Sequence, residues 1–291
     1  MPAMPSVRPR SGGCSDPALR AGHGSVRLEA MTKHERHRRI IEALDGGGSI
    51  NVVDLADQFG VSEMTVRRDL RELEATGLLR RVHGGAVRRL GRAYEPPFYL
   101  RSEQDPGPKA AIGRAAAELV QPGDAIAIDT GTTCLEAVRA LQRTRREQLT
   151  VVTASLRVAG EIASSFALDQ DLRLIVAGGI VRPGELSMVG AATRDFARAM
   201  HLDKALIGVG GIDADKGCSE FNVEDAEVKQ RFIESAKQVI VLADSTKLGQ
   251  ICFAAVCPIE VVDTLVTDAE ADPDQVAAFE AAGVDVVIAE G

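Results

Sequence analysis

The sequence predicts two domains of different class: a small winged helix-turn-helix domain over residues 31–90 and a large α/β domain with a Rossmann-like parallel sheet over residues 109–291. In the large domain, short apolar runs alternate with helical stretches, which indicates a mostly parallel sheet covered by helices on both faces. In the small domain, two short helices, a basic helix and a basic hairpin follow one another, as in a winged helix. Residues 1–30, rich in Pro, Gly, Ser and Arg, are expected to be a disordered extension, and residues 91–108 a linker.

The net charge of −8 is unevenly distributed along the chain. Residues 31–92 carry 12 Lys or Arg against 9 Asp or Glu (net +3), whereas residues 93–291 carry 18 against 31 (net −13). The acidic part would repel DNA, so nucleic acid could bind only through the basic module. Aromatic residues make up only 3% of the chain, which argues against stacking platforms for single-stranded nucleic acid.

Several other classes of protein fit poorly. No apolar run approaches the roughly 18 residues of a membrane span, so no membrane partner is expected. The five cysteines form no C-x-x-C pair, which favours free thiols in a reducing cytoplasm, with no metal and no cofactor. His34 and His37 could be half of a metal site, but no further ligand is near in the sequence, and a solvated or phosphate-facing pair is the preferred interpretation.

The first two helices are expected at Lys33–Leu44 and Val52–Phe59. Asn51 can cap the second helix because its side chain can accept a hydrogen bond from a free N–H of the first turn. Gly60 ends this helix, and a tight turn leads into the next one, which is the helix-turn-helix arrangement.

The stretch Val61–Gly77 is expected to be the DNA-reading helix. Ser62 is a good N-cap, the terminal glycine is a natural stop, and Val66, Leu70 and Leu73 have the helical spacing of one buried stripe. Short polar groups and arginines on the other face can reach base edges and phosphates, although an ordinary solvated arginine face would look the same. The residues expected to contact DNA are Ser62, Glu63, Met64, Thr65, Arg67, Arg68 and Arg71, with Arg80, Arg81 and His83 of the hairpin.

The hairpin is expected over Leu78–Val87, with a turn at Gly84–Gly85, and forms a two-stranded wing beside the reading helix. The run VSEMTVRRDLRELEATGLLRRVHGGAV at residues 61–87 closely resembles the signature of the N-terminal domain of the DeoR family of bacterial transcriptional regulators. The resemblance covers residues 33–90. It implies that Val52–Thr76 is the unit that contacts double-stranded operator DNA.

Four prolines lie between the two domains, and proline favours an extended, semi-rigid connection. Tyr94, Phe98 or Tyr99 is expected to dock on the large domain. The alternative is a solvated spacer.

The alternating pattern of the large domain predicts seven strands and six helices. The strands are expected at residues 125–128, 149–152, 172–176, 205–209, 239–242, 265–267 and 284–288. The helices are expected at residues 109–120, 132–142, 156–166, 189–200, 224–236 and 273–282.

Glycines, hydroxyl groups and a lysine recur where five successive strands end, and ligands of parallel sheets sit at that edge. After the first strand, Gly131 lets the backbone turn closely, so that the amides of residues 131–133 at a helix start can bind an anion. The pattern suits a phosphorylated polyol, with amides and Lys247 on the phosphate and carboxylates on the hydroxyls. The alternative is that these residues only make turns and caps. The expected ligand contacts are Asp129, Gly131, Thr132, Thr133, Thr153, Ser155, Gly179, Gly211, Asp213, Glu224, Lys229 and Lys247.

These loops also resemble the sensor domain of the DeoR family, which carries D-S-G-T-T, T-N-S, G-G, G-G-I-D, N-x-E with A-E-x-K, and D-S-S-K. Ala154 stands where the family has Asn, which removes one amide contact and points to a different effector. The resemblance implies a fold similar to ribose-5-phosphate isomerase and a domain that senses a phosphorylated sugar.

The leading hypothesis is therefore a DNA-binding repressor of a carbohydrate-utilisation operon, released from its operator by a phosphorylated sugar and working as a homo-oligomer, a dimer or a tetramer. The alternative is a sugar-phosphate isomerase with an accessory DNA-binding domain. Gly210 stands where those enzymes have the first aspartate of a D-G-A-D loop, so no catalytic residue is assigned, although Glu224 and Glu227 keep residual chemistry open. A third hypothesis is that the α/β domain only oligomerises.

Overall fold

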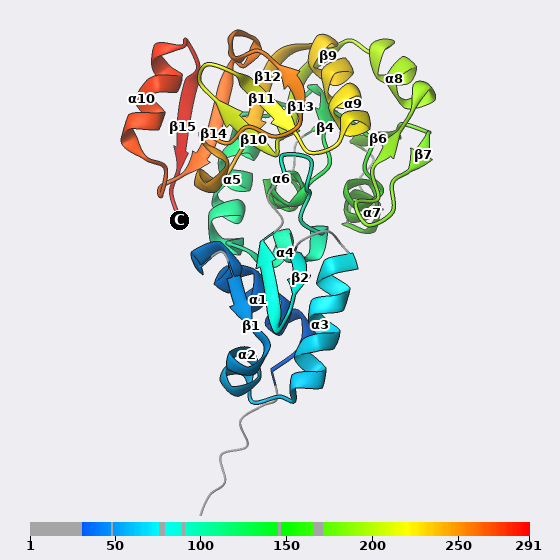
Figure 1. The fold of residues 1–291 in the computed structure, drawn as a ribbon. Coiled ribbons are helices and arrows are strands. Elements are labelled where there is room, and N and C mark those ends of the chain that lie inside the picture. The colour runs from blue at the N-terminus through cyan, green and yellow to red at the C-terminus, as the bar shows by residue number, and fades with distance from the viewer. Residues whose placement is uncertain (1–30, 48, 76–78, 89–90, 145–146, 166–170) are drawn as a thin grey trace, which may run out of the picture.

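The computed structural model describes residues 31–47, 49–75, 79–88, 91–144, 147–165 and 171–291. It has a small N-terminal domain and a large α/β domain, with α4 (Phe98–Glu103) where the two meet (Figure 1). The expected disorder of residues 1–30 and the helix stop at Gly77 lie outside the described residues.

The small domain has the predicted order of elements. Asn51 caps the second helix by accepting a hydrogen bond from Val53 N at 2.8 Å, and Gly60 ends it in the left-handed conformation with φ of 64°. Ser62 Oγ accepts a hydrogen bond from Thr65 N at 3.2 Å at the start of the third helix, as predicted. The elements are α1 (Lys33–Gly47), β1 (Ser49–Asn51), α2 (Val52–Phe59), α3 (Glu63–Ala75), β2 (Leu79–Val82) and β3 (Gly85–Arg88).

The wing differs from the prediction in two respects. A third strand joins it, since β1 pairs with β3 to give the sheet order β1-β3-β2. The turn lies at His83–Gly84, one residue earlier than expected, because Gly85 pairs with Val82 as the first residue of β3. A Cβ at Gly85 would lie 1.9 Å from the carbonyl oxygen of Ile50, so the close approach of β1 requires glycine there.

A part-buried ion pair fastens the reading helix α3 to α1. Arg36 donates from Nε to Asp69 Oδ2 at 2.7 Å and from Nη2 to Oδ1 at 3.2 Å, and only 3% of the Asp69 side chain is exposed. The predicted stripe of Val66, Leu70 and Leu73 is fully buried beside this pair.

His37 is buried, so the prediction of a solvated pair is wrong for this residue, whereas His34 is exposed. The reason is that His37 lies on the face of α1 that packs against α3. Three residues make slightly less than one helical turn, so the side chains of His34 and His37 point in different directions from α1, and only His37 reaches the contact with α3.

The connection between the domains is more structured than predicted. It contains α4 and the start of α5 (Pro106–Glu118), so it is not extended throughout. Phe98 docks on the large domain as predicted, with the guanidinium carbon of Arg157 4.0 Å from its ring centroid. Tyr94 and Tyr99 instead pack against the core of the small domain.

The large domain is a seven-stranded parallel sheet in the order β15-β14-β12-β9-β4-β5-β6. Helices α5 to α7 cover one face and α8 to α10 the other, each with an apolar core. The strands are β4 (Ala125–Ile128), β5 (Leu149–Thr153), β6 (Leu172–Val176), β9 (Leu202–Gly208), β12 (Ala236–Leu242), β14 (Thr264–Asp268) and β15 (Asp285–Ala289). The remaining helices are α6 (Thr132–Thr144), α7 (Leu156–Ser165), α8 (Ala191–Arg198), α9 (Val223–Glu234) and α10 (Pro273–Ala281).

Two small antiparallel sheets were not predicted. One consists of β10 (Gly211–Asp213), β11 (Gly217–Glu220) and β13 (Ala254–Cys257), and the other of β7 (Ile180–Val181) and β8 (Met188–Val189). They are too short to show an apolar alternation in the sequence. No helix in the described part of the chain combines the length and apolar character that crossing a bilayer requires.

Asp69→Ala is expected to lower the free energy of unfolding of the small domain by about 1–3 kcal/mol, because the part-buried guanidinium of Arg36 loses two charge-assisted hydrogen bonds. Chemical denaturation measures this change. Glu42→Ala, the control on α1, removes an exposed partner of Arg38 and should change the free energy of unfolding very little. Equal effects of the two changes would contradict the anchoring role of Asp69.

Candidate functional site

The exposed face of α3 carries the residues that the sequence assigned to DNA. Met64 is 68% exposed, and Arg67, Arg68 and Arg71 are also exposed. Arg67 pairs with Glu63 at 3.0 Å and Arg68 approaches Glu72 at 3.5 Å. Solvent-exposed pairs of this kind are worth little, so these arginines can exchange their carboxylates for phosphates.

The wing adds further cations beside α3. Arg80, Arg81 and His83 are all exposed, and Arg81 is paired with Glu74 at 3.0 Å. Ser62 and Thr65 lie at the start of α3, with their hydroxyl oxygens 2.9 Å apart. The predicted DNA contacts are thus exposed or partly exposed on α3 and on the wing, which contacts the last turn of α3 through Arg81 and Glu74.

A polar pocket lies at the carboxyl edge of the parallel sheet, where β4, β9 and β12 end. Its wall includes the start of α6, where Gly131 has φ of 118° and the first-turn N–H groups have no partner within the helix. Of the predicted ligand contacts, those that line this pocket are Gly131, Thr132, Thr133, Lys229 and Lys247.

Two features of the pocket suit an anion. The start of α6 directs amides and the positive end of the helix dipole into it. Lys247, on the short 3-10 helix η1 (Ser245–Lys247), lies with its ammonium 5.9 Å from the Phe221 ring centroid and forms no ion pair with any residue in the described ranges. An unpaired lysine beside a helix start is a phosphate-binding arrangement.

Lys229 holds the floor of the pocket. It is 2% exposed, and its ammonium donates to Asp129, to Gly208 O at 2.8 Å and towards Glu220 Oε2 at 3.2 Å. The two carboxylates raise the pKa of Lys229, while burial raises the pKa of Asp129. Lys229 therefore stays charged with its three N–H groups engaged, which suits a structural cation and not a proton-accepting base.

Asp129 itself lies beneath the pocket lining and also accepts a hydrogen bond from Gly208 N at 3.1 Å. Several other predicted contacts make local bonds outside the lining. Ser155 Oγ accepts from Val158 N at 3.3 Å at the start of α7, and Thr153 Oγ1 accepts from Ser155 N at 3.1 Å. Asp213 Oδ1 accepts two amides of the β10–β11 turn.

The last three predicted contacts also lie outside the lining. A Cβ at Gly179 would meet Thr193 Oγ1 at 2.0 Å, and one at Gly211 would meet Gln250 O at 2.3 Å, so both glycines permit close packing. Glu224 is exposed in the first turn of α9.

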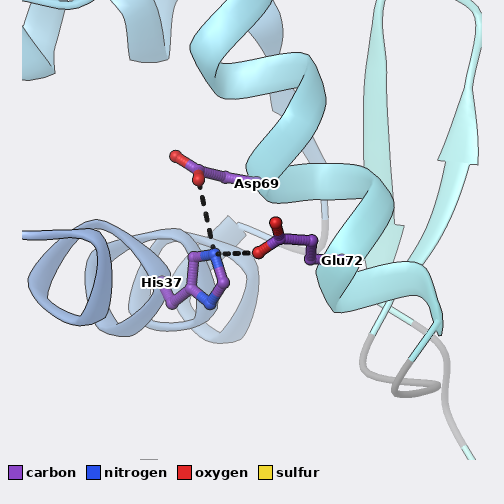
Figure 2. A group of neighbouring side chains, drawn as sticks. All are labelled: His37, Asp69 and Glu72. Atoms are coloured by element: carbon purple, nitrogen blue, oxygen red, sulfur yellow. Dashed lines mark ion pairs between the residues drawn. The ribbon is translucent and has the colours of Figure 1, made fainter.

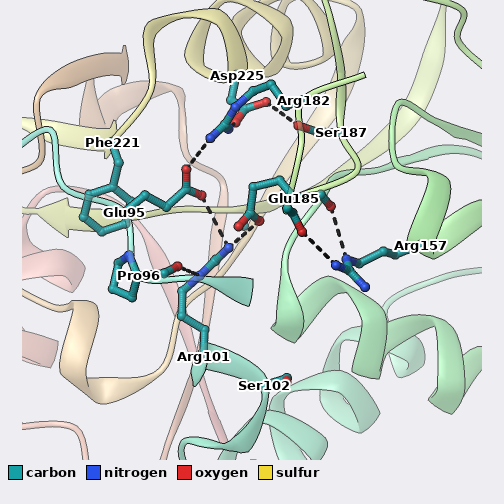
Figure 3. A network of polar contacts seen from close by, with 12 residues as sticks. Glu95, Pro96, Arg101, Ser102, Arg157, Arg182, Glu185, Ser187, Phe221 and Asp225 are labelled. Carbon is teal, nitrogen blue, oxygen red and sulfur yellow. Dashed lines mark hydrogen bonds and ion pairs between the residues drawn. The ribbon is translucent and has the colours of Figure 1, made fainter. Parts of the chain in front are cut away.

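The sequence analysis missed the charged side chains that the connecting segment contributes to the pocket. Figure 3 shows Glu95, Arg101, Arg182, Glu185 and Asp225 gathered into one network. The rule used for the prediction looked only at strand ends, and none of these residues ends a strand of the large sheet. The missed lining residues include Glu95, Arg101, Gln104, Lys109, Glu185, Glu220, Phe221 and Asp225.

A second polar cluster lies between α1 and α3. His37 Nε2 is 3.5 Å from Asp69 Oδ1 and 3.7 Å from Glu72 Oε2, so the structure brings two carboxylates to a histidine that the sequence left without partners (Figure 2). Asp69 is already bound by Arg36, and Glu72 by Lys33 at 2.5 Å. These cations neutralise both carboxylates, and burial lowers the pKa of His37, whose Nε2 has no hydrogen-bond partner among the described residues.

Comparison with known proteins agrees with the two-domain architecture. Residues 36–89 match the model of the DeoR-like helix-turn-helix domain, and residues 105–269 match that of the DeoR C terminal sensor domain. The chain is 33% identical over 257 residues to the HTH-type transcriptional regulator GlpR of Haloferax volcanii, covering 88% of this chain and 98% of that protein.

Two further similarities were found. The Glycerol-3-phosphate regulon repressor of Escherichia coli is 33% identical over 239 residues, covering 82% of this chain and 92% of the relative. Among solved structures, ribose 5-phosphate isomerase A from Methanocaldococcus jannaschii matches with a TM-score of 0.36 and 14% identity, covering 50% of this chain and 55% of that one.

Lys229→Met is expected to destabilise the large domain by about 3–5 kcal/mol near neutral pH, because two buried carboxylates lose their cation. The pKa of Asp129, already raised by burial, should rise further. A carboxyl whose folded pKa exceeds its unfolded pKa stabilises the fold at low pH and loses that contribution as pH rises through the folded pKa. The free energy of unfolding that Lys229→Met loses relative to wild type should therefore be smaller at about pH 5 than at about pH 8.

Urea denaturation at the two pH values measures this difference. Lys237→Met, which removes a lysine exposed on the same sheet, is the matched control and should show no pH-dependent deficit. A deficit in Lys229→Met that is the same at both pH values would contradict the role of the buried carboxylates.

Proposed function

We propose, on the premise that this chain belongs to the DeoR family of transcriptional regulators, that it is a repressor of a carbohydrate-utilisation operon and that a phosphorylated sugar releases it from operator DNA. The observation that carries the proposal is the ammonium of Lys247, which has no ion pair with any residue that the structure describes and lines the same pocket as the start of α6, in the same chain as a basic reading helix. One chain would then carry both a phosphate-binding site and a DNA-binding surface.

On the DNA side, the first turns of α3 enter the major groove and the wing lies along the backbone. Ser62, Glu63, Met64 and Thr65 face base edges, and the arginines of α3 and of the wing contact phosphates or guanine. The protein acts in the cytoplasm as a homo-oligomer, a dimer or a tetramer, whose two copies of α3 contact half-sites on operator DNA.

On the effector side, the phosphate binds the amides of residues 131–133 and Lys247. The hydroxyls of the sugar face the carboxylates of the pocket, and Lys229 with Asp129 keeps the floor in place. The name of the Escherichia coli relative, a regulon repressor for glycerol 3-phosphate, supports a small phosphorylated polyol as the effector class.

The arginines of α3 provide one test. Arg68→Ala removes a side chain that is 76% exposed, so it should weaken operator binding without unfolding the domain. A lost phosphate contact reduces the slope of log K against log salt by about one. Fluorescence anisotropy with DNA from upstream of the gene, at several salt concentrations, measures both quantities. Arg139→Ala, on the large domain, is the control, and an operator affinity unchanged in Arg68→Ala would remove this residue from the interface.

Lys247 provides the second test. Lys247→Ala should leave operator affinity intact and weaken the response to the sugar phosphate by about 10–100-fold, because a charge-assisted bond to phosphate is lost. The measurement is release of labelled operator by a panel of glycerol 3-phosphate, fructose 1-phosphate and ribose 5-phosphate. Lys237→Ala is the matched control on the large domain. A wild-type response in Lys247→Ala would refute the phosphate assignment.

A further inference from the structure

The segment that connects the two domains takes part in the pocket. Arg101 and Lys109 both line it, although neither belongs to a strand end of the sheet. Arg101 donates from Nε to Pro96 O at 2.9 Å and from Nη2 to Glu185, with Glu95 Oε1 at 3.4 Å. Lys109 Nζ donates to the carbonyls of Arg101 and Gln104, which closes the end of α4 onto the start of α5.

This wall is rich in charged side chains. Two guanidinium groups, on Arg101 and Arg182, pair with the three carboxylates of Glu95, Glu185 and Asp225 (Figure 3), and the ammonium of Lys109 lies in the same wall. Burial and the neighbouring Glu185 raise the pKa of Glu95. Such a wall suits hydroxyl groups, which can donate to the carboxylates and accept from the arginine.

The opposite side of α4 packs against the small domain. Leu100 is buried in the small-domain core, and the hydroxyl of Tyr99 is 3.3 Å from Nδ1 of His37. His37 Nε2 in turn faces Asp69 on α3, which is the residue that fastens the reading helix to α1 (Figure 2). Adjacent residues of α4 therefore contact the pocket and the helix pair that presents α3.

We propose that the connecting segment is the hydroxyl-binding wall of the effector pocket, and that a bound sugar phosphate weakens operator binding by drawing Arg101 and Glu95 into contact with its hydroxyls, which shifts α4 on α1. The proposal deepens the proposed function and rests on it. Arg101 binds the effector, while Tyr99 is a positioning residue that transmits the shift through His37. A chain of contacts alone does not establish coupling, so the test must measure coupling itself.

The experiment uses the full chain and the member of the sugar-phosphate panel that releases wild-type protein from operator. Calorimetry gives the dissociation constant of that sugar phosphate, and anisotropy gives the operator dissociation constant with and without it. The ratio of the two operator constants is the coupling factor. The variants are Arg101→Lys, Glu95→Gln and Tyr99→Phe, with Arg139→Lys and Lys237→Ala, both on the exposed surface of the large domain, as controls.

Arg101→Lys should bind the sugar phosphate about tenfold more weakly, because an ammonium lacks the planar fork of donors. Glu95→Gln keeps the shape of the wall and should show the same direction of change, which covers the case in which Arg101→Lys is poorly folded. Tyr99→Phe should keep both single affinities within about twofold but lower the coupling factor about fivefold, the effect of one hydrogen bond. The controls should match wild type.

A wild-type coupling factor in Tyr99→Phe, or unchanged sugar-phosphate affinity in both pocket variants, would overturn this inference and leave the proposed function standing. Failure of every sugar phosphate to bind wild-type protein would overturn the proposed function, and the inference with it. The two failures are distinguished by the wild-type titration alone.

Discussion

The buried ammonium of Lys229 is the interaction on which the pocket depends. It joins the ends of β4 and β9 to β11 through Asp129, Gly208 and Glu220. A parallel sheet ends in loops that must carry unpaired polar groups, and burying those groups is costly unless they find partners. Here the ammonium of Lys229 provides a partner for polar groups from three segments. The loops above it can therefore present the amides of α6 and Lys247 in a fixed arrangement.

The charged side chains of the pocket also explain how ligand binding in the large domain could affect the small domain. The small domain is held by an apolar core and the part-buried ion pair Arg36–Asp69, whereas the connecting segment also contributes charged side chains that lie in the pocket. An apolar core responds little to a polar ligand. A network of charges is sensitive to one, because each new hydrogen bond changes the pairing of its neighbours. The part of the chain between the two domains is thus built from the interactions that an effector can change.

Much of this architecture could be predicted from the sequence, because it rests on local chemistry. The caps at Asn51 and Ser62 and the stripe of Val66, Leu70 and Leu73 follow from helix geometry, and the positive φ of Gly131 follows from the strand-to-helix turn. These features depend on residues within a few positions of one another. Periodicity and turn chemistry therefore suffice to find them.

The rest depended on contacts between distant segments. The paired residues Arg101 and Glu185 are 84 positions apart in the sequence, and Arg182 and Glu95 are 87 apart, so no local sequence pattern predicts these pairs. The burial of His37 likewise depends on how α3 packs against α1. Long-range charged pairs are set by the tertiary fold, which is why the strand-end rule found the lining residues at the start of α6 and at η1 and missed the wall made by the connecting segment.

The central claim is that pocket and DNA surface are thermodynamically linked, and the most direct test measures the linkage from the pocket side. Calorimetry would give the affinity of the releasing sugar phosphate for the free protein and for protein saturated with operator DNA. Linkage requires the affinity to fall on the DNA-bound protein by the same factor by which the sugar phosphate weakens operator binding. Equal affinities for free and DNA-bound protein would contradict the account, because a ligand that does not distinguish the two states cannot shift the balance between them.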